Sequence, residues 1–491
     1  MDPHSPVSVE PSSQEWILEE RPDRPEEACG VFAVFGPGED VARLTYFGLH
    51  ALQHRGQESA GIAVADGHTL TVVKSLGLVP QAFKESDLAT LQGHLAIGHT
   101  RYSTTGSSSA WENAQPMVSS IGTTTIALAH NGNLVNTVEL RDALKDRGIR
   151  FRSTTDSEVI ATLVDHFTQE HGSIRGGIRD TMKYVRGAYS VVLMSEEAVY
   201  AFRDPYGVRP LSLGKLGETW VIASETCGLD IIGAQYVRDI APGEMVKIGP
   251  GGLESEQAVP AEKPSLCIFE FIYFARPDSV LNDCNLYEAR MRMGAAVARS
   301  SAVEADIVIG VPDSGVPAAV GYAKESGIPF GEGLVKNRYV GRTFISPSQS
   351  LRQQGIRLKL NPLRHVINGK RLIVVDDSIV RGNTSRKLVA LLRESGAAEV
   401  HMRITSPPVK WPCFYGIDTD TQEQLIAASK SVEQVREFIG ADSLAYLSVP
   451  DMIASTGGTA AEYCAACFTG EYPVEIPDSV KRGKLSLEPV G

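Results

Sequence analysis

Two adjacent acids follow a short run of β-branched residues in the second half of this 491-residue chain. The run at 373–375 is typical of a strand buried on both faces of a parallel sheet, and Asp376 and Asp377 come directly after it. Carboxylates at the carboxyl end of such a strand point into the crevice where open α/β sheets bind ligands. There they could bind ribose hydroxyls or a hydrated magnesium ion, which prefers oxygen ligands.

The turn after these acids offers groups that could bind a phosphate. It combines a glycine, backbone N–H groups and hydroxyls, in the residues Arg381, Gly382, Asn383 and Thr384. Free N–H groups and the helix dipole favour an anion at a helix start. Leucine and valine then recur at helical spacing as far as Gly396, so the pattern predicts a strand, a turn and a helix around a sugar phosphate. The alternative is an acidic loop that only caps a helix.

The sequence VVDDSIVRGNT at 374–384 resembles the phosphoribosyl-pyrophosphate signature of the type I phosphoribosyltransferases. The resemblance implies that Asp376 and Asp377 contact the ribose hydroxyls and a metal, and that the loop at 381–384 holds the 5′-phosphate. Asn383 stands where that family more often has threonine. Because backbone N–H groups make much of the phosphate contact, we expect this replacement to be tolerated.

Two further segments fit the same ligand. DIVIGVPDSG at 306–315 predicts a buried strand and then a turn whose N–H groups could bind pyrophosphate. By resemblance, the Ser314 hydroxyl joins the two acids around one magnesium ion per subunit. The basic, polar segment KNRYVGRTFI at 336–345 is either a solvated loop or, by resemblance, part of a loop that closes over pyrophosphate. In the second case Arg338 and Lys359 are the expected phosphate contacts.

A cysteine near the start of the chain could act as a nucleophile. Cys29 follows residues 1–28, which are rich in proline and acids and are predicted to be a disordered leader. A thiol is a weak nucleophile until a base takes its proton or its pKa falls. The α-amino group of a chain's first residue, with a pKa of about 8, can be that base, whereas an internal amide nitrogen is not basic. We therefore expect cleavage between Ala28 and Cys29.

Short motifs follow Cys29 in a fixed order. They are LQHRGQESAGIAV at 52–64, GHTRYSTTG at 98–106, AHNGNLVN at 129–136, TTDSE at 154–158 and RDPYGVRPL at 203–211. Alone, Asn131-Gly132 would be a hairpin turn and Arg101 a surface ion pair. Together the motifs resemble the glutamine amidotransferase domain of the N-terminal nucleophile hydrolase class. This implies that Asn131 and the N–H of Gly132 form an oxyanion hole, that Arg101 binds the glutamine α-carboxylate, and that Asp156 binds its α-ammonium.

Four other cysteines could hold a metal: Cys267, Cys413, Cys464 and Cys467. The C-x-x-C spacing of the last two fits zinc, an iron–sulfur cluster, a redox pair or coincidence, and spacing alone does not choose. The four resemble the cysteines that hold a [4Fe–4S] cluster in one branch of the amidophosphoribosyltransferases, a branch that also has a propeptide. This implies one [4Fe–4S] cluster per subunit. Cys227 and Cys284 match no motif and are expected to be buried free thiols.

Composition limits the other classes of function. The chain has 47 basic and 59 acidic residues and a formal charge of −12, which argues against a nucleic-acid or membrane-surface binder. No apolar run approaches the roughly 20 residues needed to span a bilayer. Seven irregularly spaced cysteines do not resemble a secreted disulfide framework. A soluble, cytoplasmic protein is expected.

The motifs divide the chain into a leader at 1–28, an amidotransferase domain at 29–262, a phosphoribosyltransferase domain at 263–475 and a polar tail at 476–491. The resemblance to the N-terminal nucleophile hydrolase class implies an αββα sandwich of α+β class for the first domain. The alternation of strands and helical segments from about Ser265 onward predicts an α/β domain with a parallel sheet after it.

The resemblance implies an amidophosphoribosyltransferase. Such an enzyme converts phosphoribosyl pyrophosphate, glutamine and water into 5-phosphoribosylamine, glutamate and pyrophosphate, the first committed step of de novo purine synthesis. It also implies a homotetramer inhibited by purine nucleotides. Two other classes remain open: a non-enzymatic sensor of phosphoribosyl pyrophosphate, and an amidohydrolase that acts through Cys29 alone.

Overall fold

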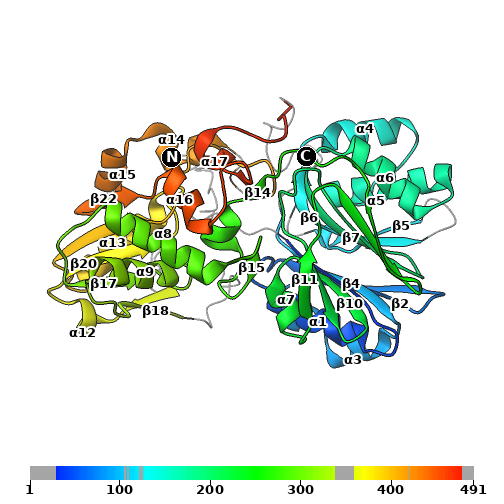
Figure 1. Cartoon of the computed structure of the whole chain (residues 1–491), viewed down its shortest axis with the longest axis horizontal. Coiled ribbons are helices and arrows are strands. Elements are labelled where there is room, and N and C mark those ends of the chain that lie inside the picture. The colour runs from blue at the N-terminus through cyan, green and yellow to red at the C-terminus, as the bar shows by residue number, and fades with distance from the viewer. Residues whose placement is uncertain are drawn as a thin grey trace, which may run out of the picture.

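The structure is a computed structural model that describes residues 29–103, 107, 110–120, 125–337, 359–417, 419 and 421–477. The expected leader, Arg338 and most of the expected tail lie outside these ranges. The described residues form two halves that lie side by side (Figure 1). Within them, no helix has the length and apolar character that crossing a membrane requires.

The first half contains a seven-stranded antiparallel sheet in the order β11-β9-β10-β1-β4-β2-β3. Its strands are β1 (Gly30–Phe35), β2 (Ser59–Ala65), β3 (Leu70–Leu76), β4 (Leu95–Arg101), β9 (Ser212–Leu216), β10 (Thr219–Ala223) and β11 (Gln235–Asp239). Apolar side chains from four helices pack on its outer face: α1 (Val41–Ala51), α2 (Val79–Ala82), α3 (Glu85–Thr90) and α7 (Thr226–Asp230).

A six-stranded antiparallel sheet lies against it, in the order β13-β12-β8-β7-β6-β5. Its strands are β5 (Met117–Ser119), β6 (Ile126–Leu134), β7 (Gly187–Met194), β8 (Val199–Arg203), β12 (Glu244–Gly249) and β13 (Gly252–Gln257). Its outer face is covered by α4 (Thr137–Asp146), α5 (Asp156–His171) and α6 (Ile174–Tyr184). A short helical turn at Trp111–Asn113 precedes β5.

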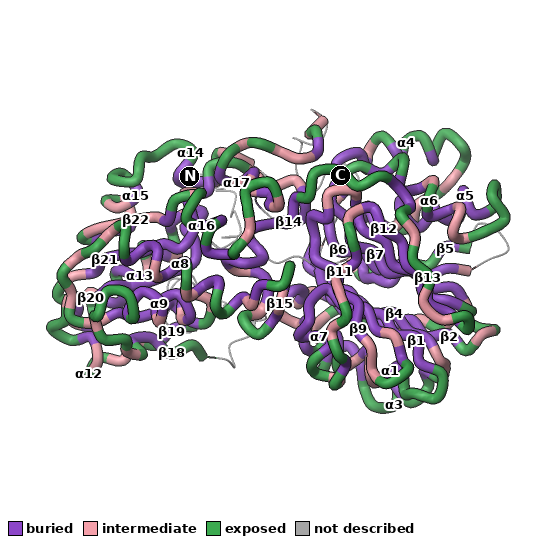
Figure 2. Tube along the Cα trace, viewed as in Figure 1, coloured by how far each residue is buried: buried purple, intermediate pink, exposed green. Residues whose placement is uncertain are grey.

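The first strand shows how the layers are held together. Val31 and Ala33 of β1 lie in the core between the two sheets, together with Ala127 of β6. Phe32 and Val34 point to the opposite face and pack under the helices. Both faces of β1 are therefore buried, as the continuous buried trace in Figure 2 shows. The αββα sandwich expected from the sequence is confirmed.

The second half is built on a parallel sheet in the order β17-β20-β21-β22. Its strands are β17 (Ile307–Gly310), β20 (Arg371–Asp376), β21 (Glu399–Ile404) and β22 (Ser443–Tyr446). One face packs on α8 (Leu286–Ser300), α9 (Val316–Ser326) and α16 (Val449–Thr456), and the other on α13 (Asn383–Glu394) and α15 (Val432–Ile439). The expected α/β arrangement is confirmed, including the buried strand before Asp377 and the helix after Gly382.

Shorter elements complete this half. They are β14 (Leu266–Cys267), a π-helical turn at Glu270–Phe274, β15 (Val280–Leu281), β16 (Cys284–Asn285), β18 (Leu334–Lys336), β19 (Leu360–Pro362), α12 (Arg364–Ile367), a 3₁₀ turn at Gln422–Gln424, α14 (Ile426–Ser429), β23 (Tyr463–Cys464) and α17 (Ala466–Thr469). The expected domain limit at 262/263 falls between β13 and β14 and stays a prediction.

Buried charges join the two halves. Arg55 of the first half lies between Glu225 and Glu270, with its Nη2 2.5 Å from Glu270 Oε2. Arg209 Nη1 is 3.1 Å from Glu270 Oε1. All four side chains are fully buried. Since an unpaired buried charge is strongly disfavoured, each of these groups depends on the others.

Candidate active sites

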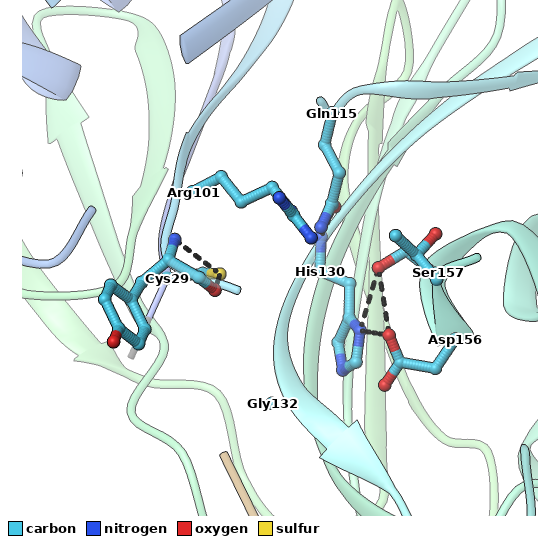
Figure 3. Close-up of a pocket in the computed structure, with 9 residues that line it drawn as sticks. Cys29, Arg101, Gln115, His130, Gly132, Asp156 and Ser157 are labelled. Atoms are coloured by element: carbon cyan, nitrogen blue, oxygen red, sulfur yellow. Dashed lines mark hydrogen bonds and ion pairs between the residues drawn. The ribbon is translucent and has the colours of Figure 1, made fainter. Parts of the chain in front are cut away.

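A pocket in the first half brings together residues that are far apart in the sequence. Its lining consists of Cys29, Arg101, Tyr102, Gln115, His130, Gly132, Thr155, Asp156 and Ser157. Figure 3 shows Cys29 and Arg101 on one side of this pocket and His130, Asp156 and Ser157 on the other. The two sides come from the two different sheets of the sandwich, because β1 and β4 belong to one sheet and β6 to the other.

The Cys29 thiol is enclosed. It donates a hydrogen bond to the carbonyl oxygen of Tyr102, with Sγ 3.2 Å from that oxygen. Burial raises the pKa of the thiol to about 12, although the nearby Arg101 guanidinium acts in the opposite direction. At neutral pH an enclosed thiol of this kind is almost entirely protonated, so it needs a base before it can attack.

Two oppositely charged residues flank the thiol. Arg101, the last residue of β4, is buried, and its Nη1 lies 3.5 Å from Glu58 Oε2. Asp156 is the first residue of α5, and its carboxylate accepts a hydrogen bond from the N–H of Leu134 at 3.0 Å. Burial raises the pKa of Asp156, but the facing His130 and this N–H outweigh burial and hold the pKa below its usual value. The pocket thus presents a cation and an anion, as an amino acid's α-carboxylate and α-ammonium require.

Asn131 and Gly132, the residues expected to form an oxyanion hole, both lie on strand β6. Both polar atoms of the Asn131 side chain are buried and have no hydrogen-bond partner among the described residues. Such an orphaned amide is costly unless a ligand satisfies it. Gly132 has φ +147°, and a Cβ there would come within 2.0 Å of the Ala188 carbonyl oxygen. Only glycine therefore fits at position 132. Gly132 also lines the pocket.

Sequence reasoning missed several residues that support this pocket. Glu58 accepts hydrogen bonds from the N–H and the hydroxyl of Ser103, at 2.8 and 3.0 Å. The Gln115 Oε1 accepts the N–H of His130 at 2.8 Å, which ties β6 to the preceding loop. Glu58 and His130 lie inside the motifs at 52–64 and 129–136, so their positions in the sequence could have indicated that they belong to the site. Gln115 lies in none of those motifs.

The second half brings together the three expected magnesium ligands. The Ser314 hydroxyl donates to Asp377 Oδ2 at 2.5 Å, although these residues come from different strand ends. Asp377 also accepts the Ser378 hydroxyl at 2.7 Å, and its own N–H donates to Asp376 Oδ1 at 3.0 Å. Both acids are buried. Three oxygen-bearing side chains therefore meet at the carboxyl end of the parallel sheet, which is where such sheets bind ligands.

The expected phosphate loop lies beside these acids. Gly382, with φ +81°, is the N-cap of α13, and Asn383 and Thr384 begin this helix. The Arg381 guanidinium donates to Gln424 Oε1 at 2.6 Å. Helix α13 has no side-chain hydrogen bond that caps its N-terminus, so its first N–H groups can bind an anion in the same crevice.

The residues expected in the closing loop are only partly described. Arg338 lies outside the described residues. Lys359 is exposed, and its carbonyl accepts the N–H of Asn337 at 2.9 Å, next to the hairpin of β18 and β19. Lys336, on β18, pairs with Asp313 of the expected pyrophosphate turn at 2.7 Å. The hairpin is thus in contact with that turn.

The four cysteines expected to bind a cluster gather at the junction. Cys267 and Cys464 are register partners in the parallel pair β14 and β23, and Cys467 follows on α17. Burial raises the pKa of Cys464, and the charges of the Cys267 and Cys413 thiols add to this effect. As the side chains stand, no group of three or more His, Cys, Asp or Glu in the described ranges is placed to hold a metal ion. The donor set itself, four soft thiols in an apolar environment, fits an iron–sulfur cluster.

All seven cysteines are described and free. Cys227 and Cys284 are both buried, as expected, and Arg292 Nη2 lies 3.2 Å from Cys284 Sγ.

Comparisons with known proteins agree with the division of the chain into two halves with different sites. Residues 99–230 match the glutamine amidotransferase domain family, and residues 284–405 match the phosphoribosyl transferase domain family. An amidophosphoribosyltransferase of Synechococcus elongatus is 58% identical over 96% of this chain and 96% of its own length. That of Bacillus subtilis is 49% identical, over 92% of this chain and 95% of its own length.

Two solved structures are similar over nearly the whole chain. The structure of the allosteric regulatory enzyme of purine biosynthesis has a TM-score of 0.89 and 48% identity, covering 93% of this chain and 99% of that one. The glutamine phosphoribosylpyrophosphate amidotransferase of B. subtilis, complexed with ADP and GMP, has a TM-score of 0.87 and 48% identity, covering 92% and 98%.

Proposed function

This chain belongs to the amidophosphoribosyltransferase family and catalyses the first step of purine biosynthesis, and we propose how its two sites divide that reaction. The first half releases ammonia from glutamine, and the second half uses it to displace pyrophosphate from phosphoribosyl pyrophosphate. The observation that supports this division is the presence of a nucleophile pocket in one half and an acid pair at parallel strand ends in the other.

In the first half, Arg101 and Asp156 bind the α-carboxylate and α-ammonium of glutamine. Cys29 Sγ then attacks the side-chain amide carbon, and the oxygen takes up negative charge. Asn131 and the N–H of Gly132 stabilise that oxygen, which gives the buried orphan amide of Asn131 its partner. Loss of ammonia leaves a thioester on Cys29, and water hydrolyses it to glutamate and the free thiol.

The base in this step is the α-amino group of Cys29, which exists only after cleavage between Ala28 and Cys29. Two features support the cleavage: the thiol is buried with a pKa of about 12, and no other residue donates to or accepts from its sulfur in the described chain except Tyr102 through its backbone. An amine with a pKa of about 8 takes the thiol proton and returns it to the departing ammonia.

In the second half, the turn at 381–384 holds the 5′-phosphate on the N-terminus of α13. Asp376 and Asp377 orient the ribose. Ammonia attacks carbon 1, the bond to pyrophosphate breaks, and loss of a proton from nitrogen gives 5-phosphoribosylamine. Arg338 and Lys359 are proposed to contact the pyrophosphate. Ser314, Asp376 and Asp377 would hold one magnesium ion, which would neutralise charge on the leaving pyrophosphate.

Cys267, Cys413, Cys464 and Cys467 would hold one [4Fe–4S] cluster, which would link the segments around β14, β23 and α17 as a structural group. Its support is the donor chemistry and the gathering of the four thiols.

Regulation and assembly are proposed from the resemblance to the family, which implies a homotetramer. A cytoplasmic location is proposed because free thiols suit a reducing compartment. Purine nucleotides are proposed as inhibitors, since the B. subtilis relative was solved with ADP and GMP.

The test is pyrophosphate release from anaerobically purified enzyme with magnesium and phosphoribosyl pyrophosphate. Glutamine and free ammonia are compared as donors, and iron absorbance is read on the same sample. Release with both donors is expected. Glutamate formation without pyrophosphate release would contradict the proposed role of the second half.

A further inference from the structure

A loop of the second half touches the strand expected to form the oxyanion hole in the first half. The loop is Cys413–Ile417, and the strand is β6. Gly416 of the loop has φ +108°, and a Cβ added there would lie 3.3 Å from the carbonyl carbon of Gly132 and 3.4 Å from its oxygen. The atom nearest to that Cβ is Arg209 Nη2, at 3.1 Å. Since 3.1 and 3.3 Å are tighter than most Cβ contacts, a side chain at position 416 would have to displace Arg209 or the Gly132 backbone by a few tenths of an ångström.

Two side chains of the first half donate hydrogen bonds to the backbone carbonyl groups of two consecutive loop residues, Phe414 and Tyr415. Asn133, next to Gly132, donates from Nδ2 to the Phe414 oxygen at 3.0 Å. Arg209 donates from Nε to the Tyr415 oxygen at 3.0 Å, and its Nη1 pairs with Glu270. Both contacts join residues more than 200 positions apart in the sequence. The position of the loop therefore depends on the first half, and that of Gly132 on the loop.

The loop is itself held in place. The N–H of Cys413 donates to the Thr419 oxygen at 3.1 Å, and the Tyr415 N–H points to Cys413 Sγ at 3.4 Å. The Tyr415 hydroxyl donates to the Val474 oxygen at 2.7 Å and accepts the Val474 N–H at 3.0 Å. A loop fixed at several points can hold a neighbouring backbone in one position.

We propose that the loop Cys413–Ile417 positions the oxyanion hole of the glutamine site, with Gly416 and Asn133 as positioning residues. Gly132 contacts the Ala188 carbonyl on one side and the loop on the other, so a shift of the loop moves the Gly132 N–H. An N–H that moves away from the developing oxyanion loses most of its stabilising effect, since misplacement by about 1 Å costs on the order of 100-fold in rate. This inference rests on the proposed attack by Cys29.

The variants are Asn133→Asp, which removes the donor to Phe414, and Gly416→Ala, whose added methyl group presses on both Arg209 Nη2 and the carbonyl carbon of Gly132. We expect each to lower kcat for glutamine hydrolysis about 10- to 100-fold, with KM for glutamine changed less than about threefold. Synthesis from free ammonia should stay within about twofold, because the acid pair and its turn are not touched.

Each variant has a matched control. Asn136→Asp removes a similar amide donor, whose partner at 2.9 Å is the Tyr184 carbonyl within the first half. Gly440→Ala changes a glycine with φ +77° whose added Cβ meets no atom within 4 Å. Both controls should keep glutamine hydrolysis within about threefold of the parent enzyme.

Alkylation of Cys29 by iodoacetamide separates positioning from general damage. In that reaction the sulfur displaces iodide from carbon, and no oxyanion forms. If the loop positions the hole, alkylation should stay within about twofold while glutamine hydrolysis falls. Equal losses in alkylation and hydrolysis, or equal losses with glutamine and ammonia, would overturn the proposal. Failure of the proposed function would look different, because Cys29→Ala would then still use glutamine.

Discussion

The glutamine pocket is assembled between two antiparallel sheets, whereas the phosphoribosyl site lies at the carboxyl ends of parallel strands. In the first site Cys29, Arg101 and Asp156 are all buried, with at most 5% of each residue exposed. In the second the acids are buried, but Asn383 and Lys359 are exposed. The first site is enclosed and its thiol inert until a base appears, and the second is open to solvent on the side of its turn.

This difference has a chemical reason. A released ammonia molecule must be kept from bulk water, where it would be protonated and lost as a nucleophile, so enclosure suits the first site. Phosphoribosyl pyrophosphate is a large polyanion that must enter from solvent, so an open crevice suits the second. The two sites should therefore respond independently to substitutions within them, and together when the buried charge network of Arg55, Arg209 and Glu270 that joins the two halves is broken.

The largest effect is expected from Cys29→Ala. Without its nucleophile the first site should lose glutamine-dependent synthesis by about 10,000-fold or more, while ammonia-dependent synthesis stays within about twofold. Pyrophosphate release with each donor measures both. Cys227→Ala, another buried cysteine of the same half, is the control and should keep both reactions. Retained glutamine use in Cys29→Ala would remove Cys29 from the mechanism.

Enclosure of the thiol predicts a large pH effect on its alkylation. With residues 1–28 attached, a thiol pKa of about 12 leaves roughly 1000-fold less thiolate at pH 8 than an exposed thiol would have. Because the thiolate is the deprotonated form, the rate should rise about tenfold per pH unit up to at least pH 10. After cleavage the rate should instead level off near the pKa of the α-amine, about 8.

Iodoacetamide kinetics on the two forms measure this difference, with mass spectrometry to confirm the site. The same pH profile before and after cleavage would mean that the α-amine is not the base.

In the open site, Asp376→Asn combined with Asp377→Asn should lower synthesis about 100- to 1000-fold with either donor. Glutamate release by the first site should persist, since no residue of that pocket is altered. Asp306→Asn is the control, because Asp306 precedes the same sheet at its amino end and pairs with Arg371 at 3.1 Å. A double variant that keeps full synthesis would show that this acid pair does not bind the substrate.

The junction tests whether the two regions are independent in stability. Glu270→Gln leaves the fully buried Arg55 and Arg209 without their shared carboxylate. The free energy of unfolding should fall by about 3 kcal/mol, which changes the folding equilibrium constant by a factor of roughly 100. Both activities should then be lost together at intermediate urea concentrations. Glu256→Gln, which weakens the solvent-accessible pairs of Glu256 with Arg175 and Arg179, should cost less than about 1 kcal/mol. Urea unfolding that is unchanged in Glu270→Gln would separate the two halves energetically.

The two regions also differ in how far the sequence predicts them. The strand, turn and helix around Asp376 are contiguous, so local spacing was enough to predict them, and the structure has them as β20 and α13. In the first half, no single motif was sufficient. Several motifs in a fixed order resemble the glutamine amidotransferase domain, and that resemblance predicted the sandwich. The structure brings Cys29, Arg101 and Asp156 to one pocket. Their roles stay predictions.

Contacts across the junction could not be predicted. The Asn133 amide meets Phe414, 281 positions away, and nothing in the local sequence indicates that partner. The same holds for Arg55 and Glu270, because tertiary packing alone brings them together. Arg338 and the expected leader lie outside the described residues, so their predictions are untested.

The smallest effect is expected at the exposed rim of the open site. Lys359 is exposed, so water and salt screen the attraction between its ammonium group and a bound pyrophosphate. One such contact contributes about 1 kcal/mol or less to binding. Lys359→Ala should therefore raise KM for phosphoribosyl pyrophosphate about three- to fivefold with little change in kcat, because the contact is made equally in the ground state and the transition state. Lys370→Ala is the control, since Lys370 is also exposed but lies before the amino end of β20, away from the acids. The difference should shrink at high salt. An unchanged KM in Lys359→Ala would place the pyrophosphate contacts elsewhere, whereas a fall in kcat of tenfold or more would mean that Lys359 acts mainly in the transition state.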